Sequence, residues 1–207
     1  MLQTYIKTPF RLIVHPFQEF WDLKYENTGR LRLALIFVFL LAVVNVLGQE
    51  VSGFLVNYTD PRTINSISQL EFIVLPYILW CVANWSLTTL MDGEGKFVEI
   101  LMATAYALLP MIVIDFVMIW LSRILTIEED PIYFLFKSLA TIWFIWLLFI
   151  GTMTVHQYSI KKTIVTMLLT LVVILFILFI GLLFFSLIQE MLVFIETIYK
   201  ELRFRTW

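Results

Sequence analysis

Five long apolar runs constrain the fold of this chain more than any other feature. The hydrocarbon core of a bilayer is about 30 Å thick and takes about 20 helical residues to cross, and each run reaches that length. The predicted spans are residues 31–56, 70–90, 97–121, 131–155 and 164–188. The last span contains no charged residue, so we expect it at the periphery of the bundle, where lipid covers it.

The composition leads to the same fold class. Hydrophobic residues make up 61% of the 207 residues and charged residues only 14%, which is more apolar side chain than a soluble domain of this size buries. We therefore expect an all-α polytopic membrane helix bundle that forms a single domain over residues 1–207. The net charge is −2 and no basic run is long enough to follow a phosphate backbone, so the sequence gives no indication of nucleic-acid binding.

The two ends of the chain show helical patterns without a membrane-spanning run. Within residues 1–30, Phe17, Phe20 and Trp21 share one helical face, which suits an amphipathic helix in the membrane interface. A helix packed under the bundle would show the same pattern. Residues 189–207 repeat apolar positions at helical spacing, which predicts an amphipathic helical extension that reaches the membrane surface.

The distribution of basic residues predicts the orientation in the membrane. The side that holds the amino terminus carries more Lys and Arg than the opposite side, so the positive-inside rule places the amino terminus in the cytoplasm and, after five crossings, the carboxyl terminus outside. Two turns between spans then face the cytoplasm and could meet a partner. Their candidate residues are Asp92, Glu94, Lys96, His156, Lys161 and Lys162.

Four charged positions within or beside the spans are candidates for an intramembrane site. Asp115 lies six residues before the end of the third span and Lys137 six residues after the start of the fourth, so in neighbouring antiparallel helices they reach the same depth, about 9 Å. Glu50 and Glu71 lie on the same side of the membrane and could join them. Such a cluster is typical of an ion or proton site. We favour a structural pair, because one lysine neutralises only one acid.

Neutral polar side chains on the spans favour helix association. The first span carries a stripe of Asn45, Gln49 and Ser52, and the second carries the pair Asn84 and Thr88. Side chains of this kind form hydrogen bonds between membrane helices that are worth about 0.6 kcal/mol on average. We interpret them as packing contacts.

No motif for catalysis or metal binding appears. His15 and His156 belong to no HExxH-type ligand set, and the single Cys81 lies inside an apolar run, which leaves no disulfide, CxxC or zinc spacing. The glycine-rich segment 93–96 lacks the spacing and the following Ser or Thr of a phosphate-binding loop. We therefore expect a protein that is not an enzyme, with no catalytic residues, no cofactor and no metal.

Four short motifs stand out along the chain. They are Trp80-Cys-Val-Ala-Asn-Trp85, Leu90-Met-Asp-Gly-Glu-Gly-Lys-Phe97, Tyr106-Ala-Leu-Leu-Pro110 and Gly151-Thr-Met-Thr-Val-His156. Together they resemble the bacterial branch of the Yip1 domain family, and the resemblance extends from about residue 15 to residue 203. It implies a five-span helical bundle with a cytoplasmic amino terminus, which agrees with the charge distribution.

The resemblance also implies a function. Bacterial relatives are often companions of carbohydrate ABC importers by gene neighbourhood, which suggests an accessory or scaffolding subunit of such a permease in the bacterial plasma membrane. Eukaryotic relatives act in vesicle trafficking, partly through Rab-type GTPases bound by a longer cytosolic amino-terminal region that we expect this chain to lack. The family offers no catalytic residues to carry over.

Two other functions remain open at this point. One is a small, self-sufficient transporter or channel that works through Asp115, Lys137 and Glu71. The other is a membrane-trafficking or membrane-shaping protein that uses its amphipathic ends. Both share with the leading hypothesis a multi-pass chain in contact with the lipid bilayer.

Overall fold

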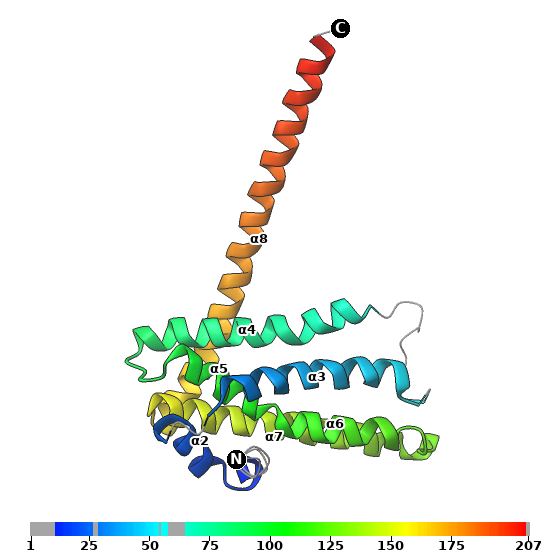
Figure 1. The fold of residues 1–207 in the computed structure, drawn as a ribbon, viewed down its shortest axis with the longest axis vertical. Coiled ribbons are helices and arrows are strands. Elements are labelled where there is room, and N and C mark those ends of the chain that lie inside the picture. Colours follow the sequence, from blue (N-terminus) through cyan, green and yellow to red (C-terminus); the bar gives the residue numbers. More distant parts are fainter. Residues whose placement is uncertain (1–10, 27–28, 54, 58–64, 206–207) are drawn as a thin grey trace.

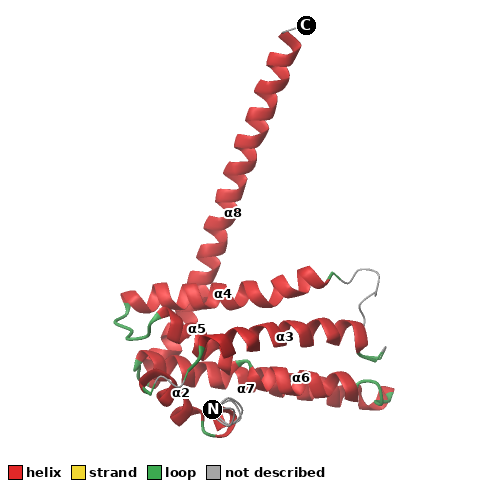
Figure 2. Cartoon of the chain, viewed as in Figure 1, coloured by secondary structure: helices red, strands yellow, loops and turns green. Residues whose placement is uncertain are grey.

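The computed structural model of the protein describes residues 11–26, 29–53, 55–57 and 65–205, and every regular element within them is a helix (Figure 2). The all-α fold class is therefore confirmed. The elements in chain order are α2 (Pro16–Tyr25), α3 (Leu31–Val51), α4 (Ser66–Leu90), α5 (Phe97–Ala107), α6 (Leu109–Leu121), the 3-10 helix η2 (Ile127–Glu129), α7 (Asp130–His156) and α8 (Ile160–Arg205).

Five helical segments are long and apolar enough to cross a membrane, as the sequence predicts. Four of them, α3, α4, α7 and the segment formed by α5 and α6, lie alongside one another (Figure 1). The predicted third span is divided at Leu108, because α5 ends at Ala107 and α6 begins at Leu109, with Pro110 in its first turn. Proline has no backbone N–H and fits the first turn of a helix best, which explains the break. Pro76, by contrast, lies inside the continuous helix α4.

The segment formed by α5 and α6 lies at the centre of the bundle. Of its most apolar stretch 61% is buried, against 17% to 28% for α3, α4 and α7. Its small residues Ala103, Ala105 and Ala107 are buried, which allows the neighbouring backbones to approach closely. Beside them Tyr106 is fully buried, and its ring meets the edge of Phe37 with 5.2 Å between ring centroids.

Helix α2 packs under the bundle against α7 and α5. Phe20 and Leu23 are buried, whereas Phe17 and Trp21 remain exposed on the other side. The structure therefore agrees with the packed alternative for α2 and leaves two aromatic rings on its outer side. Glu19 is also buried, although it is charged.

Helix α8 is the largest departure from five spans lying side by side. It continues for 46 residues through the predicted carboxyl-terminal extension, a length of about 69 Å at 1.5 Å per residue. Only its first turns lie against α4 and α7, and the rest runs away from the bundle (Figure 1). The contact uses Thr163, Thr166 and Thr170, which are buried at helical spacing. Beyond them α8 offers bulky side chains and no further small residue until Gly181.

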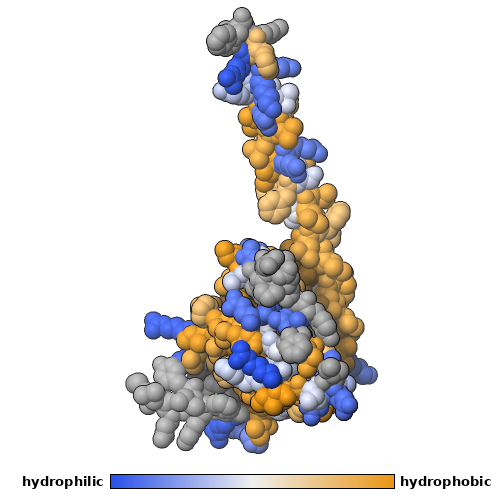
Figure 3. All heavy atoms as spheres, turned by 90° about the vertical axis from the view of Figure 1, so that its right-hand side faces the viewer, coloured by the Kyte–Doolittle hydropathy of each residue, from blue (hydrophilic) through white to orange (hydrophobic). Residues whose placement is uncertain are grey.

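The exposed surface of α8 changes character along its length. The part nearest the bundle is apolar, and the far end carries polar side chains (Figure 3). Large apolar residues such as Leu175 and Leu182 are 67% and 71% exposed. The expectation of a peripheral, lipid-compatible fifth span is therefore confirmed for its surface, although its direction differs from the other spans.

Candidate functional site

Two polar sites lie at opposite ends of the four-helix body. The first, which we name the His156 cluster, consists of Asn84, Thr88, His156, Tyr158 and Thr170, at the end where α4 and α7 finish. The second, which we name the Asp115 cavity, lies at the other end between α3, α6 and α7. Each joins helices that are distant in sequence.

His156 links three helices through one chain of hydrogen bonds. It is the last residue of α7, and the left-handed conformation of Gln157, with φ of 56°, then turns the chain toward α8. The His156 Nε2 atom lies 3.0 Å from Asn84 Oδ1 on α4. The Asn84 amide in turn donates to Thr170 Oγ1 on α8 at 3.3 Å. Since all three side chains are buried, this chain fixes the base of α8 against α4 and α7.

The glycine-rich turn between α4 and α5 closes over the His156 ring. A Cβ atom at Gly93 would lie 2.7 Å from His156 Nδ1 and from Tyr158 Oη, and one at Gly95 would lie 2.7 Å from His156 Cε1. Only a residue without a side chain allows this approach. Neither glycine has a positive φ, so the requirement is one of space.

Tyr158 and Lys24 hold the same turn from two further sides. The Tyr158 hydroxyl donates to the Met91 carbonyl at 3.0 Å, and burial together with the nearby Asp92 carboxylate raises the pKa of Tyr158. The Lys24 ammonium on α2 donates to a Glu94 carboxylate oxygen at 3.1 Å and to the Val155 carbonyl at 2.8 Å. The Lys24 side chain is only 8% exposed. These contacts therefore hold the turn, α2 and the end of α7 together.

The structure separates the residues predicted to face a partner. His156 is 1% exposed, so its ring does not form part of a partner-facing surface, because the glycine-rich turn covers it. Lys162 is half-buried with its ammonium 4.2 Å from the centre of the Tyr158 ring. The remaining four residues, Asp92, Glu94, Lys96 and Lys161, are exposed.

The Asp115 cavity contains the predicted intramembrane pair. Asp115 Oδ1 and Lys137 Nζ are 3.9 Å apart, as the equal depth of the two residues in antiparallel helices predicts. The cavity has a volume of about 280 Å³. Its lining includes the whole polar stripe of α3 and consists of Val44, Asn45, Gly48, Gln49, Ser52, Val56, Asn57, Asp115, Ile119, Tyr133 and Lys137.

Glu50 and Glu71 do not join this pair. Both side chains are exposed, and neither forms an ion pair with any residue that the structure describes. Glu50 follows Gln49 directly and therefore points to a different side of α3. Glu71 belongs to α4, which contributes nothing to the lining of the cavity. The predicted cluster of three acids and one lysine is thus reduced to one acid and one lysine.

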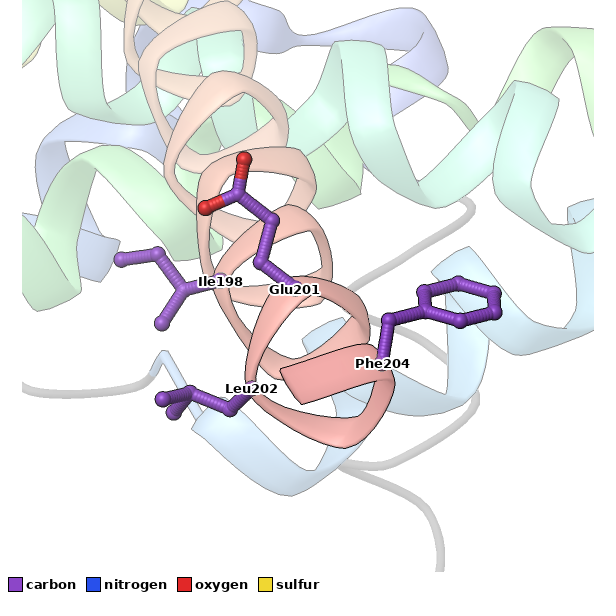
Figure 4. Close-up of a pocket in the computed structure, with 4 residues that line it drawn as sticks. All are labelled: Ile198, Glu201, Leu202 and Phe204. Atoms are coloured by element: carbon purple, nitrogen blue, oxygen red, sulfur yellow. The ribbon is translucent and has the colours of Figure 1, made fainter. Parts of the chain in front are cut away.

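A third hollow lies near the far end of α8 (Figure 4). Its lining residues Ile198, Glu201, Leu202 and Phe204 all belong to the same helix, with Ile198 and Leu202 on one side of it and Phe204 on the other. Residues of a single helix cannot enclose a ligand. Among the described residues no group of three or more His, Cys, Asp and Glu side chains could hold a metal ion.

Sequence reasoning missed the partners of His156. Asn84 and His156 are noticeable as polar residues on two spans, but nothing in the sequence joins them. Lys24 and Tyr158 lie outside the spans and carry no motif. One feature of the sequence could have indicated where α8 contacts the bundle. Thr163, Thr166 and Thr170 recur at helical spacing at the start of an otherwise apolar run.

Comparisons with known proteins assign this chain to a family. The model of the Yip1 domain family matches residues 10–182, a region that contains the His156 cluster and the Asp115 cavity. A dual 3',5'-cyclic-AMP and -GMP phosphodiesterase beta from Plasmodium falciparum is 30% identical over 95 residues. That match covers 46% of this chain but only 8% of the phosphodiesterase, so it carries no argument about activity here. No solved structure matches. Because the family model covers most of the chain, this protein is a member of the Yip1 domain family.

Proposed function

We propose that this integral membrane protein is a non-enzymatic accessory or scaffolding subunit that binds laterally to another membrane protein complex. The observation that carries the proposal is the course of α8. The helix is anchored at its base by Thr163, Thr166 and Thr170, and beyond them its apolar side chains are exposed. A rigid apolar helix of this kind is suited to pack against the membrane helices of a partner.

The physics of helix association in lipid supports this use of α8. Lipid tails are as apolar as leucine side chains, so association depends on close packing, and small residues favour it. Gly181 lies within the apolar part of α8, and a Cβ added there would meet nothing within 4 Å. The position is therefore open to the backbone of a second helix.

The His156 cluster gives α8 a defined direction. The hydrogen bond from Asn84 to Thr170 and the tied turns beside it hold the first turns of α8 against α4. A partner that binds the far part of α8 would thus be placed at a fixed distance from the four-helix body. A helix held in a fixed direction suits a scaffolding role better than a flexible tether does.

The partner that we propose is a carbohydrate ABC importer of a bacterial plasma membrane. The support comes from the resemblance to the bacterial branch of the family, which rests on Asn84, Gly93, Gly95 and His156 among other motif residues. In this proposal the amino terminus is cytoplasmic and the carboxyl terminus lies outside. The exposed side chains of Asp92, Lys96 and Lys161 then face the cytoplasm.

Purification from the native host in a mild detergent tests the proposal. The wild-type protein should co-purify with ABC permease subunits identified by mass spectrometry. Gly181→Leu should abolish co-purification without lowering the unfolding temperature, because no other described part of the chain lies within 4 Å of a Cβ added there. Val172→Leu enlarges another exposed residue of α8 and serves as the matched control. A wild-type protein that elutes alone would contradict the proposal.

A second candidate is a small transporter or channel, which the Asp115 cavity favours. Its residues are Asp115 and Lys137, without the exposed Glu71. The core between the cavity and the His156 cluster is filled by fully buried side chains such as Tyr106, Leu147 and Ile150, which argues against an open pore. Reconstituted vesicles distinguish the two functions, since a transporter would show a solute flux that Asp115→Asn abolishes.

A further inference from the structure

The Asp115 cavity presents opposite charges side by side that do not fully satisfy each other. The Asp115 Oδ1 to Lys137 Nζ distance of 3.9 Å exceeds the range of about 2.7 to 2.9 Å for a charge-assisted hydrogen bond. The Lys137 side chain is 44% exposed and the Asp115 side chain 16%. The carboxylate thus lies deeper than the ammonium, and both can receive another group.

Two further oxygen atoms in the lining lack partners. Gln49 Oε1 and Ser52 Oγ are buried and form no hydrogen bond with any residue that the structure describes. Leaving a buried polar atom without a partner is destabilising, so such atoms often mark a bound water or ion. Together with the Asp115 carboxylate on α6 they give the lining three kinds of acceptor, one from Gln49 on α3 and one from Ser52 directly after it.

We propose that the Asp115 cavity binds a small zwitterionic group in which a primary ammonium lies next to an anion such as phosphate. The ammonium has three N–H donors, which match the Asp115 carboxylate, Gln49 Oε1 and Ser52 Oγ. The anion meets the ammonium of Lys137 at the open side of the cavity. The site and the ligand each carry one positive and one negative charge, so binding leaves the net charge of the site at zero.

The charge of the lining excludes simpler ligands. A metal cation or a lone amine would be attracted by Asp115 and repelled by Lys137, and a lone anion would meet the reverse arrangement. Because the pair is neutral as a whole, a ligand that is neutral as a whole but carries both charges fits best. The volume of about 280 Å³ corresponds to about nine waters of roughly 30 Å³ each, and the ethanolamine phosphodiester headgroup of a phospholipid has a comparable number of heavy atoms and no net charge.

The position of the cavity allows two sources for this group. Asp115 lies six residues before the end of α6, about 9 Å below the helix end, which is within reach of a phospholipid headgroup. A soluble zwitterion could enter the same opening from the aqueous side. The shared chemistry is a primary ammonium beside a phosphate, and the experiment separates the sources.

The test compares two lipids that differ only in methylation of the amine. Purified protein in a non-ionic detergent is titrated with dihexanoyl phosphatidylethanolamine, with dihexanoyl phosphatidylcholine and with free phosphoethanolamine, and binding is measured by native mass spectrometry. The ethanolamine lipid should bind at least about tenfold more tightly than the choline lipid, because a quaternary ammonium has no N–H to donate. Equal binding of the two lipids would overturn the proposal.

Variants assign the binding to this cavity. Asp115→Asn and Gln49→Leu should each reduce the preference for the ethanolamine lipid. Lys137→Met should weaken the binding of both lipids to the same extent, because it removes the contact with the phosphate. Glu71→Gln, an exposed residue at the same end of the bundle, is the control and should change nothing. Gln49→Leu keeps the test valid if Asp115→Asn fails to fold. An unchanged preference in both variants would place the binding elsewhere and overturn the proposal.

The free compound identifies the source. Binding of free phosphoethanolamine to the wild type and not to Asp115→Asn would support a soluble zwitterion. Binding of the ethanolamine lipid alone, with the same dependence on Asp115, would support a lipid headgroup held in place by its acyl chains. Absence of binding by all three probes would contradict the proposal.

Discussion

Gly93 and His156 are in contact so close that a Cβ atom on Gly93 would lie 2.7 Å from the imidazole Nδ1. This approach joins the turn after α4 to the last residue of α7. It explains why the glycine-rich turn and the distant histidine occur together in the motifs of this chain. The contact holds α4 and α7 together at the end of the bundle where both helices finish.

The first prediction concerns the two glycines of this turn. Gly93→Ala and Gly95→Ala should each lower the free energy of unfolding by about 1 to 3 kcal/mol, because an added methyl group overpacks the His156 ring. The measurement is thermal unfolding in detergent, followed by tryptophan fluorescence. Gly181→Ala is the control and should cause no loss, since a Cβ added there meets no other described part of the chain within 4 Å and alanine favours a helix more than glycine does. Equal losses at all three glycines would contradict the proposed contact.

A second prediction separates an ion pair whose lysine is buried from one in which both side chains are exposed. Lys24→Met leaves Glu94 and the Val155 carbonyl without their donor, and we expect a loss of about 1 to 3 kcal/mol. Lys200→Met removes a pair with Glu196 in which both side chains are more than 60% exposed, and it should leave the unfolding temperature unchanged. If both variants behaved alike, Lys24 would have no role in fixing α2.

The third prediction concerns the anchor of α8. Thr170→Val removes the acceptor of the Asn84 amide with little change in shape, and should cost about 1 kcal/mol. Thr197→Val removes only a hydrogen bond to the Val193 carbonyl on the exposed part of the same helix. Comparison of the two unfolding temperatures checks the prediction. A smaller effect at Thr170 than at Thr197 would mean that the base of α8 is not anchored through Asn84.

The fourth prediction is a pH dependence that arises at Glu19. Burial raises the pKa of Glu19 above its usual value of 4.5, and Arg11 only partly opposes this. The stabilising effect of the protonated carboxyl is therefore complete below pH 4.5 and is lost as the pH rises through the higher pKa of the folded state.

Glu19→Gln keeps the side chain neutral at every pH. The variant should be more stable than the wild type at pH 7, and the difference should shrink at pH 4. Unfolding temperatures of both proteins at the two pH values provide the measurement. A difference that grows on acidification would show that the carboxylate is stabilised in the folded protein, contrary to this account.

The sequence predicted the spans because length and hydropathy alone decide whether a helix can cross a bilayer. It also predicted the pairing of Asp115 with Lys137, because equal depth in antiparallel helices needs no knowledge of side-chain conformation. Both inferences use only the position of a residue along its helix. Such positions can be counted before a structure is known.

The His156 cluster could not be predicted in this way. Asn84 lies well inside α4, whereas His156 is the final residue of α7, so equal depth gives no reason to pair them. Their contact depends on the close approach of the glycine-rich turn, which is a matter of space around Gly93 and Gly95. The direction of α8 could not be predicted either, because apolar side chains cover its whole circumference and do not indicate which face packs against the bundle.

Photo-crosslinking from α8 tests the central claim most directly. A photoreactive amino acid is placed at Leu182 on α8 or, as a control, at Phe72 on α4, which is equally exposed at 71%. The proteins are irradiated in native membranes, and the adducts are identified by mass spectrometry. The account predicts one discrete adduct from position 182 that contains an ABC permease subunit, and none from position 72. Adducts with lipid alone at both positions, or only with a second copy of this chain, would contradict it.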